Sequence, residues 1–250
     1  MQPRADVVRS QSPTPTLVAG DDRPRGRDAR EPGETEELPP VHHRYLLVSL
    51  TLDQAVDLTR TGDLWLFRGR SAADHAIRTL TNSPVNHVGM TVALEDMPPL
   101  LWHAELGQSL PDLWTGGHHR GVQLHDLRDA VGVWSDRYGQ RAWLRQLTTT
   151  VTKEMEDGVL RVIARLDGTP FPATLSLAGR WAQGRVRRAA SVESTYCAEV
   201  VASTYQAMGL LAGDRPSNYY DPGSFWSGDD LELTGGAMLG DEIAVDVSLA

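Results

Sequence analysis

The single cysteine of this 250-residue chain lies in the segment Ser194-Thr195-Tyr196-Cys197-Ala198-Glu199-Val200-Val201. Apolar residues recur at helical spacing from here onward, which predicts a helix over about residues 195–210. Ser194 or Thr195 is a suitable N-cap, so Cys197 is expected in the first turn. Unpaired backbone amides and the positive end of the helix dipole favour a thiolate there. The segment therefore predicts a helix with a candidate nucleophile, and a cysteine that only packs in the core is the competing interpretation.

Two further segments supply candidate partners for that thiol. His87 stands in Pro84-Val85-Asn86-His87-Val88-Gly89-Met90, at the start of an apolar strand, and an imidazole titrates near neutrality. In Leu101-Trp102-His103-Ala104-Glu105, strand alternation puts His103 and Glu105 on one side. Either side chain can accept a hydrogen bond from His87 and hold its tautomer. The sequence period does not choose between them.

The combination of these segments resembles the permuted papain-like cysteine hydrolases and amidases of the NlpC-type superfamily. The order histidine, polar residue, cysteine matches the permuted branch, because an ordinary papain-like chain has its cysteine first. The resemblance extends over about residues 47–247. The motifs that carry it are Gly62-Asp63-Leu64, Asn86-His87-Val88-Gly89-Met90, the Leu-Trp-x-Ala strand at 101–104, Gly121-Val122-Gln123-Leu124, Gly168-Thr169-Pro170-Phe171 and Tyr196-Cys197-Ala198-Glu199-Val200-Val201.

The resemblance implies an α+β, permuted papain-like fold in which an antiparallel sheet packs on the cysteine-bearing helix. It also implies that Cys197 is the nucleophile and His87 the general base and acid. His103 precedes Ala104 and so occupies the third position, where a glutamate is commoner in the family; Glu105 remains the rival. The backbone N–H of Cys197 is expected to be one oxyanion donor.

The expected activity is cleavage of an amide or acyl bond through a thioester acyl-enzyme, with a small-molecule, peptide or acyl-bearing substrate. No cofactor and no metal are expected. A thiol acyltransferase is a close variant, and a noncatalytic binding protein that retains the fold is the alternative from another class. The substrate and the oligomeric state stay open.

The chain is expected to consist of a leader and one domain. Residues 1–41 are rich in proline and charge, with seven of the fifteen prolines in the first 40 residues, and the first aromatic residue is Tyr45. Such a segment buries too little apolar surface to offset its ordering entropy, which predicts disorder. Residues 42–250 are expected to form the hydrolase domain.

Apolar spacing and turn residues predict the elements of that domain. Helices are expected over about residues 52–58, 72–80, 140–166 and 195–210. Strands are expected over about residues 64–67, 85–94, 100–106, 121–124 and 243–247.

Composition limits the partners and the compartment. The charge balance of 24 − 33 = −9, with a pI near 5.3, argues against nucleic acid as a partner. One cysteine allows neither an intramolecular disulfide nor a zinc site of several thiolates. No apolar run approaches the roughly 18 residues of a transmembrane helix, and the first 20 residues lack a signal-peptide core, so a cytoplasmic protein is expected. His118 and His119 are interpreted as a polar loop.

Overall fold

The computed structural model describes residues 49–70, 83–105, 107–170, 192–228 and 231–247. The predicted disordered leader over residues 1–41 and the predicted helix over 72–80 lie outside these residues. Within them the molecule is a mixed α+β structure, built on one sheet of seven strands with helices on both faces. The coarse fold class expected from the sequence is therefore confirmed.

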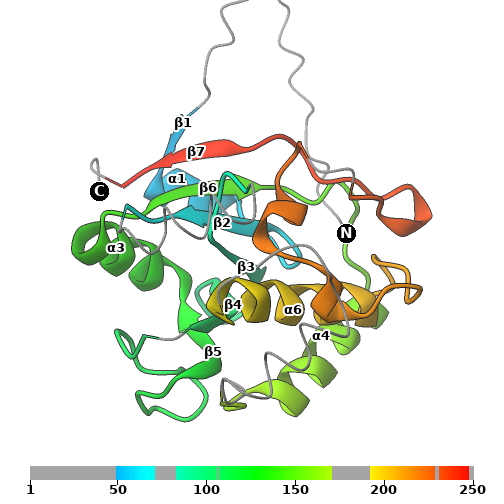
Figure 1. The fold of residues 1–250 in the computed structure, drawn as a ribbon, viewed down its shortest axis with the longest axis horizontal. Coiled ribbons are helices and arrows are strands. Elements are labelled where there is room, and N and C mark those ends of the chain that lie inside the picture. The colour runs from blue at the N-terminus through cyan, green and yellow to red at the C-terminus, as the bar shows by residue number, and fades with distance from the viewer. Residues whose placement is uncertain (1–48, 71–82, 106, 171–191, 229–230, 248–250) are drawn as a thin grey trace, which may run out of the picture. The chain divides into compact units, whose positions relative to one another are not determined.

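The sheet has the strand order β1-β7-β6-β2-β3-β4-β5 (Figure 1). Its neighbouring strands pair antiparallel, except that β1 and β7 at one edge are parallel. The predicted strand segments at 64–67, 85–94, 100–106, 121–124 and 243–247 are all found. The seven strands are β1 (Ser49–Thr51), β2 (Leu64–Arg68), β3 (His87–Val92), β4 (Leu100–Glu105), β5 (Gly121–Asp126), β6 (Arg141–Arg145) and β7 (Ile243–Asp246).

The helices begin at polar caps that the sequence supplies. Thr51 and Gln54 form a reciprocal capping box at the start of the first helix, and Asp126 caps the second by accepting the N–H of Asp129. The helices are α1 (Leu52–Leu58), α3 (Leu127–Tyr138), α4 (Lys153–Leu166) and α6 (Val192–Ala207), followed by short 3₁₀ turns η1 (Ser217–Tyr219), η2 (Pro222–Phe225) and η3 (Thr234–Gly236). None of the described helices is long and apolar enough to cross a bilayer.

Strand alternation divides the core between the two faces of the sheet. Val88, Trp102 and Ala104 pack with α6 and α4 in one hydrophobic cluster. Phe67 and Leu101 belong to a second cluster with α1 and α3. Successive side chains of a strand point to opposite faces. His87, which precedes Val88, and His103, between Trp102 and Ala104, therefore lie on the α3 face. In Figure 1 the strands β3 and β4 run between α3 and the pair α6 and α4.

The predicted helix over residues 140–166 is wrong in its first half. Arg141–Arg145 is strand β6, and only Lys153–Leu166 is helical. Along this strand, Ala142 and Leu144 pack in the cluster with α1 and α3, whereas Trp143 packs in the cluster with α4 and α6. The burial therefore alternates with the strand period of two. The helix α3 was not predicted. It ends at Gly139, which adopts the left-handed conformation and returns the chain to the sheet.

Candidate functional site

Three adjacent strands each place one histidine on the α3 face of the sheet. His87 is the first residue of β3, His103 lies on β4 and His125 on β5. Nε2 of His87 lies 3.1 Å from Nδ1 of His103, and Nε2 of His103 lies 3.1 Å from Nδ1 of His125. We call these three rings the histidine row. Hydrogen bonds therefore join them end to end through both nitrogens of the middle ring.

The indole of Trp134 on α3 covers the histidine row. Its ring centroid lies 5.3 Å from that of His87, 5.0 Å from His103 and 6.5 Å from His125, each in an edge-to-face arrangement. Phe67 of β2 stands at the end of the row, 5.8 Å from His87. All three histidines are buried. The rings are therefore held in place by packing and have little contact with solvent.

Burial keeps the histidine row neutral. Desolvation lowers the pKa of His87 to about 3, with a smaller effect from the charge of His125. Desolvation likewise lowers the pKa of His125 to about 4, although the nearby Asp112 opposes this. The pKa of His103 falls well below its ordinary value, first through desolvation and then through both neighbouring rings. At neutral pH each ring therefore has one protonated nitrogen and one lone pair.

The structure separates the two side chains that the sequence left as rivals. His103 contacts His87, whereas Glu105 lies beside His125, with Oε2 3.8 Å from Nδ1 of that ring. The other oxygen, Oε1, accepts a hydrogen bond from Ser109 Oγ at 3.1 Å. Ser109 Oγ in turn accepts the indole N–H of Trp134. Of the two, His103 is the residue in position to orient His87.

The ligand atoms of His103, Glu105 and His125 lie within 4.8 Å of one another, close enough for one metal ion to bind all three. Several buried polar atoms around them have no hydrogen-bond partner among the described residues: Nδ1 of His87, Nε2 of His125, and both amide atoms of Gln123. Gln123 is the register partner of His103 on β5. Because buried polar atoms are normally hydrogen-bonded, the arrangement has the character of a binding site.

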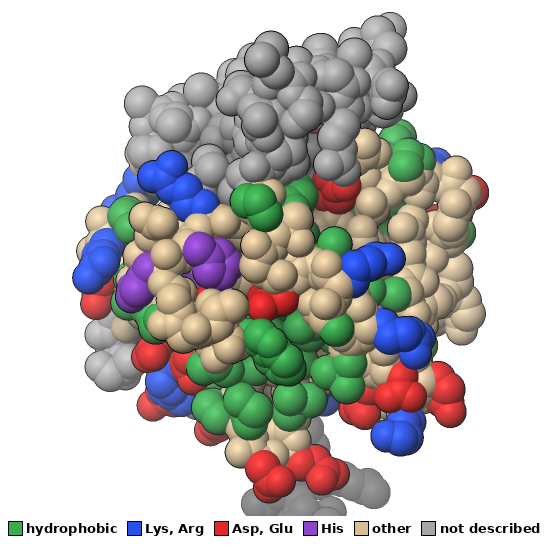
Figure 2. Space-filling view, turned by 90° about the horizontal axis from the view of Figure 1, so that it is seen from below, with side chains coloured by type: hydrophobic (Ala, Val, Ile, Leu, Met, Phe, Trp, Pro, Cys, Tyr) green, Lys and Arg blue, Asp and Glu red, His purple; other side chains and the backbone are tan. Residues whose placement is uncertain are grey.

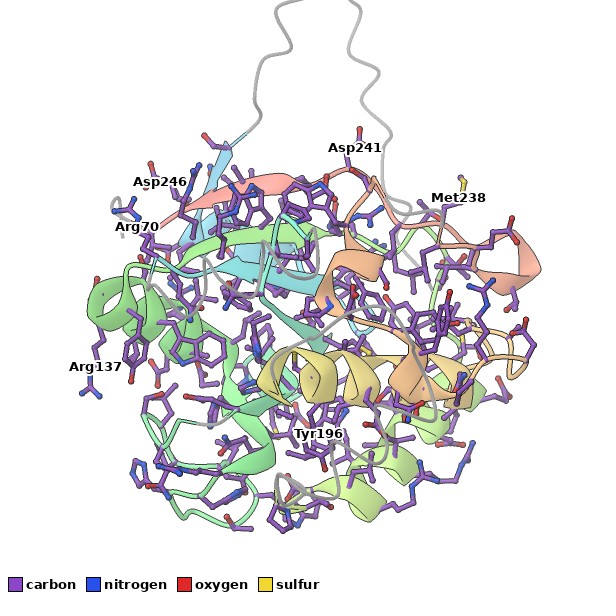
Figure 3. The ribbon with its side chains drawn as sticks, viewed as in Figure 1. Arg70, Arg137, Tyr196, Met238, Asp241 and Asp246 are labelled. Carbon is purple, nitrogen blue, oxygen red and sulfur yellow. The ribbon has the colours of Figure 1, made fainter. Side chains whose placement is uncertain are left out.

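Cys197 lies apart from the histidine row. It is buried in the hydrophobic cluster on the α6 face, while the three rings lie on the α3 face. Figure 3 labels its neighbour Tyr196 beside α6. Nδ1 of His87, the nitrogen that is not bonded to His103, has no hydrogen-bond partner among the described residues. The structure thus joins two of the three predicted residues, His87 and His103, and buries the third, Cys197, in the cluster on the other face of the sheet.

The start of α6 also differs from the prediction. The helix begins at Val192, so Ser194 and Thr195 lie inside it and Cys197 is its sixth residue. Only the first turn has unpaired N–H groups, and the dipole effect fades beyond it. The predicted N-cap, the first-turn position of Cys197 and its N–H as oxyanion donor are therefore wrong.

The adjacent histidines predicted to form a polar loop lie at the surface. Figure 2 shows histidine side chains at the surface; of the described histidines, His118 is exposed, His119 is half-buried and the other three are buried. Nδ1 of His118 lies 3.0 Å from the carbonyl oxygen of Gln108, and Nε2 of His119 lies 3.7 Å from the carboxylate of Asp112. These contacts belong to the loop itself, as expected.

His125 is the site residue that sequence reasoning missed. The predicted strand stopped at Leu124, one residue too early, whereas β5 continues to Asp126. A signal was present: Val122 and Leu124 are apolar, so Gln123 and His125 alternate with them in the way that His103 alternates with its neighbours. Extending the alternation by one residue would have placed His125 on the same side of its strand as Gln123.

Comparison with known proteins adds little. No family model and no curated protein matches the chain. One solved structure that is similar is described as the metalloprotein yiiX from Escherichia coli O157:H7, DUF1105, at 21% identity and a TM-score of 0.39. The match covers 59% of this chain and 65% of that one.

Proposed function

We propose that the chain is a cysteine-dependent hydrolase or amidase with a permuted papain-like architecture. Cys197 is the nucleophile, His87 the general base and acid, and His103 the residue that orients His87. The substrate is an amide or an acyl ester of a small molecule or peptide. What supports the architecture is the chain order histidine, histidine, cysteine, with α6 packed against β3 and β4.

The observation that carries the proposal is the hydrogen bond between His87 and His103. It occupies Nε2 of His87 and leaves Nδ1, which is buried and has no partner among the described residues. A nucleophile–base–orienter set needs a base with one nitrogen held and the other facing the nucleophile. Cys197 and the His87 ring lie on opposite faces of the sheet, and His87 is the first residue of β3. The proposal therefore requires the thiol to come within hydrogen-bond distance of Nδ1 at this end of the strand.

The chemistry follows from neutral rings. His87 accepts the thiol proton at Nδ1 as sulfur attacks the carbonyl carbon, and the carbon–leaving-group bond breaks as His87 returns that proton to the leaving group. Water then adds to the thioester, releasing the carboxylic acid and restoring the thiol. His103 is neutral, so it orients the imidazolium and stabilises its charge less than a carboxylate would.

Alkylation of Cys197 and labelling with an acyl-directed electrophile test this proposal. In the unaltered chain Cys197 is expected to be the labelled residue. His87→Asn is expected to lower the labelling rate by about 100-fold or more, the size of a general-base contribution. His118→Asn, which changes an exposed histidine, is the matched control and is expected to leave the rate unchanged. Equal rates in the unaltered chain and in His87→Asn would refute the pairing of Cys197 with His87.

Two other functions remain to be separated by experiment. The complete burial of Cys197 among apolar residues favours a noncatalytic binding protein that retains the fold. In that case Cys197 reacts with iodoacetamide no faster than free cysteine. A thiol acyltransferase differs only in its acceptor, so trapping the acyl-enzyme and adding amines, alcohols or water distinguishes it from a hydrolase.

A further inference from the structure

We propose that His103, Glu105 and His125 bind one divalent transition-metal ion of the zinc type. The proposal concerns the opposite face of the sheet from Cys197 and does not depend on the thiol. It rests on the convergence of three ligand atoms from two neighbouring strands.

The distances between these atoms fit a single ion. Tetrahedral zinc with ligands at about 2.0–2.2 Å keeps them roughly 3.3 Å apart. Nε2 of His103 lies 3.1 Å from Nδ1 of His125, and Oε2 of Glu105 lies 3.8 Å from the same nitrogen. All three ligand atoms lie within 4.8 Å of one another, so metal binding requires the Glu105 carboxylate to move closer to the two rings.

The donor set selects the class of metal. Two imidazoles and one carboxylate suit Zn²⁺ and its first-row neighbours, whereas Ca²⁺ and Mg²⁺ prefer sites made of oxygen. Three protein ligands leave a tetrahedral ion one position for water or another small ligand. Gln123, whose buried amide atoms lack partners among the described residues, belongs to the same face and offers polar atoms for such a ligand.

The surroundings hold the ligands in the way that metal sites do. Ser109 donates a hydrogen bond to the far oxygen of Glu105, and Trp134 donates one to Ser109. A histidine that binds metal usually donates its other N–H to an acceptor, which sets its tautomer and ring orientation. For His103 that acceptor is Nε2 of His87, 3.1 Å from its Nδ1.

Metal binding has a consequence for His87, and this step rests on the proposed function. When Nε2 of His103 binds the ion, the ring proton of His103 occupies Nδ1 and is donated to Nε2 of His87. The proton of neutral His87 then occupies its own Nδ1. That tautomer has no lone pair facing a thiol, so the metal-bound form is expected to be inactive as a general base.

The binding test uses the full chain carrying Cys197→Ala, so that no thiolate competes for the ion. After chelator treatment, Zn²⁺ is titrated by calorimetry and Co²⁺ binding is followed by visible absorption. One equivalent with a tetrahedral Co²⁺ spectrum is expected. Glu105→Gln and His125→Asn are each expected to weaken binding by more than about 100-fold, since even supporting residues contribute roughly 10- to 100-fold. Ser109→Ala, a supporting residue, is expected to fall within that lower range.

His118→Asn is the control, because that histidine is exposed, and it is expected to leave the affinity unchanged. Circular dichroism of each variant establishes that it is folded. If His125→Asn does not fold, Glu105→Gln still tests the site. Absence of stoichiometric Zn²⁺ binding, or binding lost in His118→Asn, would overturn the proposal. The ¹⁵N shifts of His87 report its tautomer in the same Cys197→Ala protein, independently of thiol reactivity.

Discussion

Acid should destabilise this fold through the histidine row. Each row histidine has a pKa below that of an unfolded histidine, so the unfolded chain binds more protons in acid. The stability that the neutral rings contribute is therefore complete above about pH 6.5 and is lost as pH falls toward their folded pKa values. The direction is the same for all three rings, because burial is the first cause for each.

The magnitude follows from the two numerical pKa values. His87 titrates at about 3 and His125 at about 4, so both stay neutral in the folded chain at about pH 5. That pH lies about 1.5 units below the ordinary histidine value, and each unit is worth about 1.36 kcal/mol, which gives about 2 kcal/mol per ring. At about pH 5 the two rings together lower the free energy of unfolding by about 4 kcal/mol, and His103 lowers it further. Typical domains have only about 5–15 kcal/mol to lose.

Urea unfolding followed by tryptophan fluorescence, at about pH 7 and about pH 5 with chelator present, measures this loss. His125→Gln removes one titrating ring and is expected to reduce the loss by about 2 kcal/mol. His118→Gln, at an exposed position, is expected to leave it unchanged. The reasoning fails if the unaltered chain loses less than about 1 kcal/mol, or if both variants change the loss equally.

Three further substitutions test the packing that positions the site. Thr204→Val is expected to cost about 1–3 kcal/mol in urea unfolding, because it leaves the buried indole N–H of Trp102 without its acceptor, and Thr204→Ser should restore most of this. Gly158→Ala is expected to cost about 1–3 kcal/mol in thermal unfolding, since its Cβ would lie 2.5 Å from the carbonyl oxygen of Ala207 where α4 crosses α6. Asp63→Asn is expected to cost about 1–3 kcal/mol, because one amide oxygen cannot replace the two carboxylate oxygens that accept the N–H groups of Arg60 and Leu147; an unchanged unfolding midpoint would contradict this.

Local sequence signals predicted most of the described elements. Apolar spacing predicted α1, an apolar run predicted β3 with His87 at its start, and alternation along β4 put His103 and Glu105 on one side. These signals are local because a cap or a strand period involves residues a few positions apart. They failed at β6, where five residues between two helices are too few to distinguish a period of two from one of 3.6.

What the sequence determined by itself is which residue types stand on which side of each strand. That information already implied that His103 and Glu105 share a face, but not which of them meets His87. The tertiary structure decided this, because register across β3, β4 and β5 sets which rings touch. It also added His125 to the row and put Cys197 on the face covered by α6. Pairing between strands and packing of helices on a sheet join residues far apart in the chain, and a one-residue change of register would exchange the two faces.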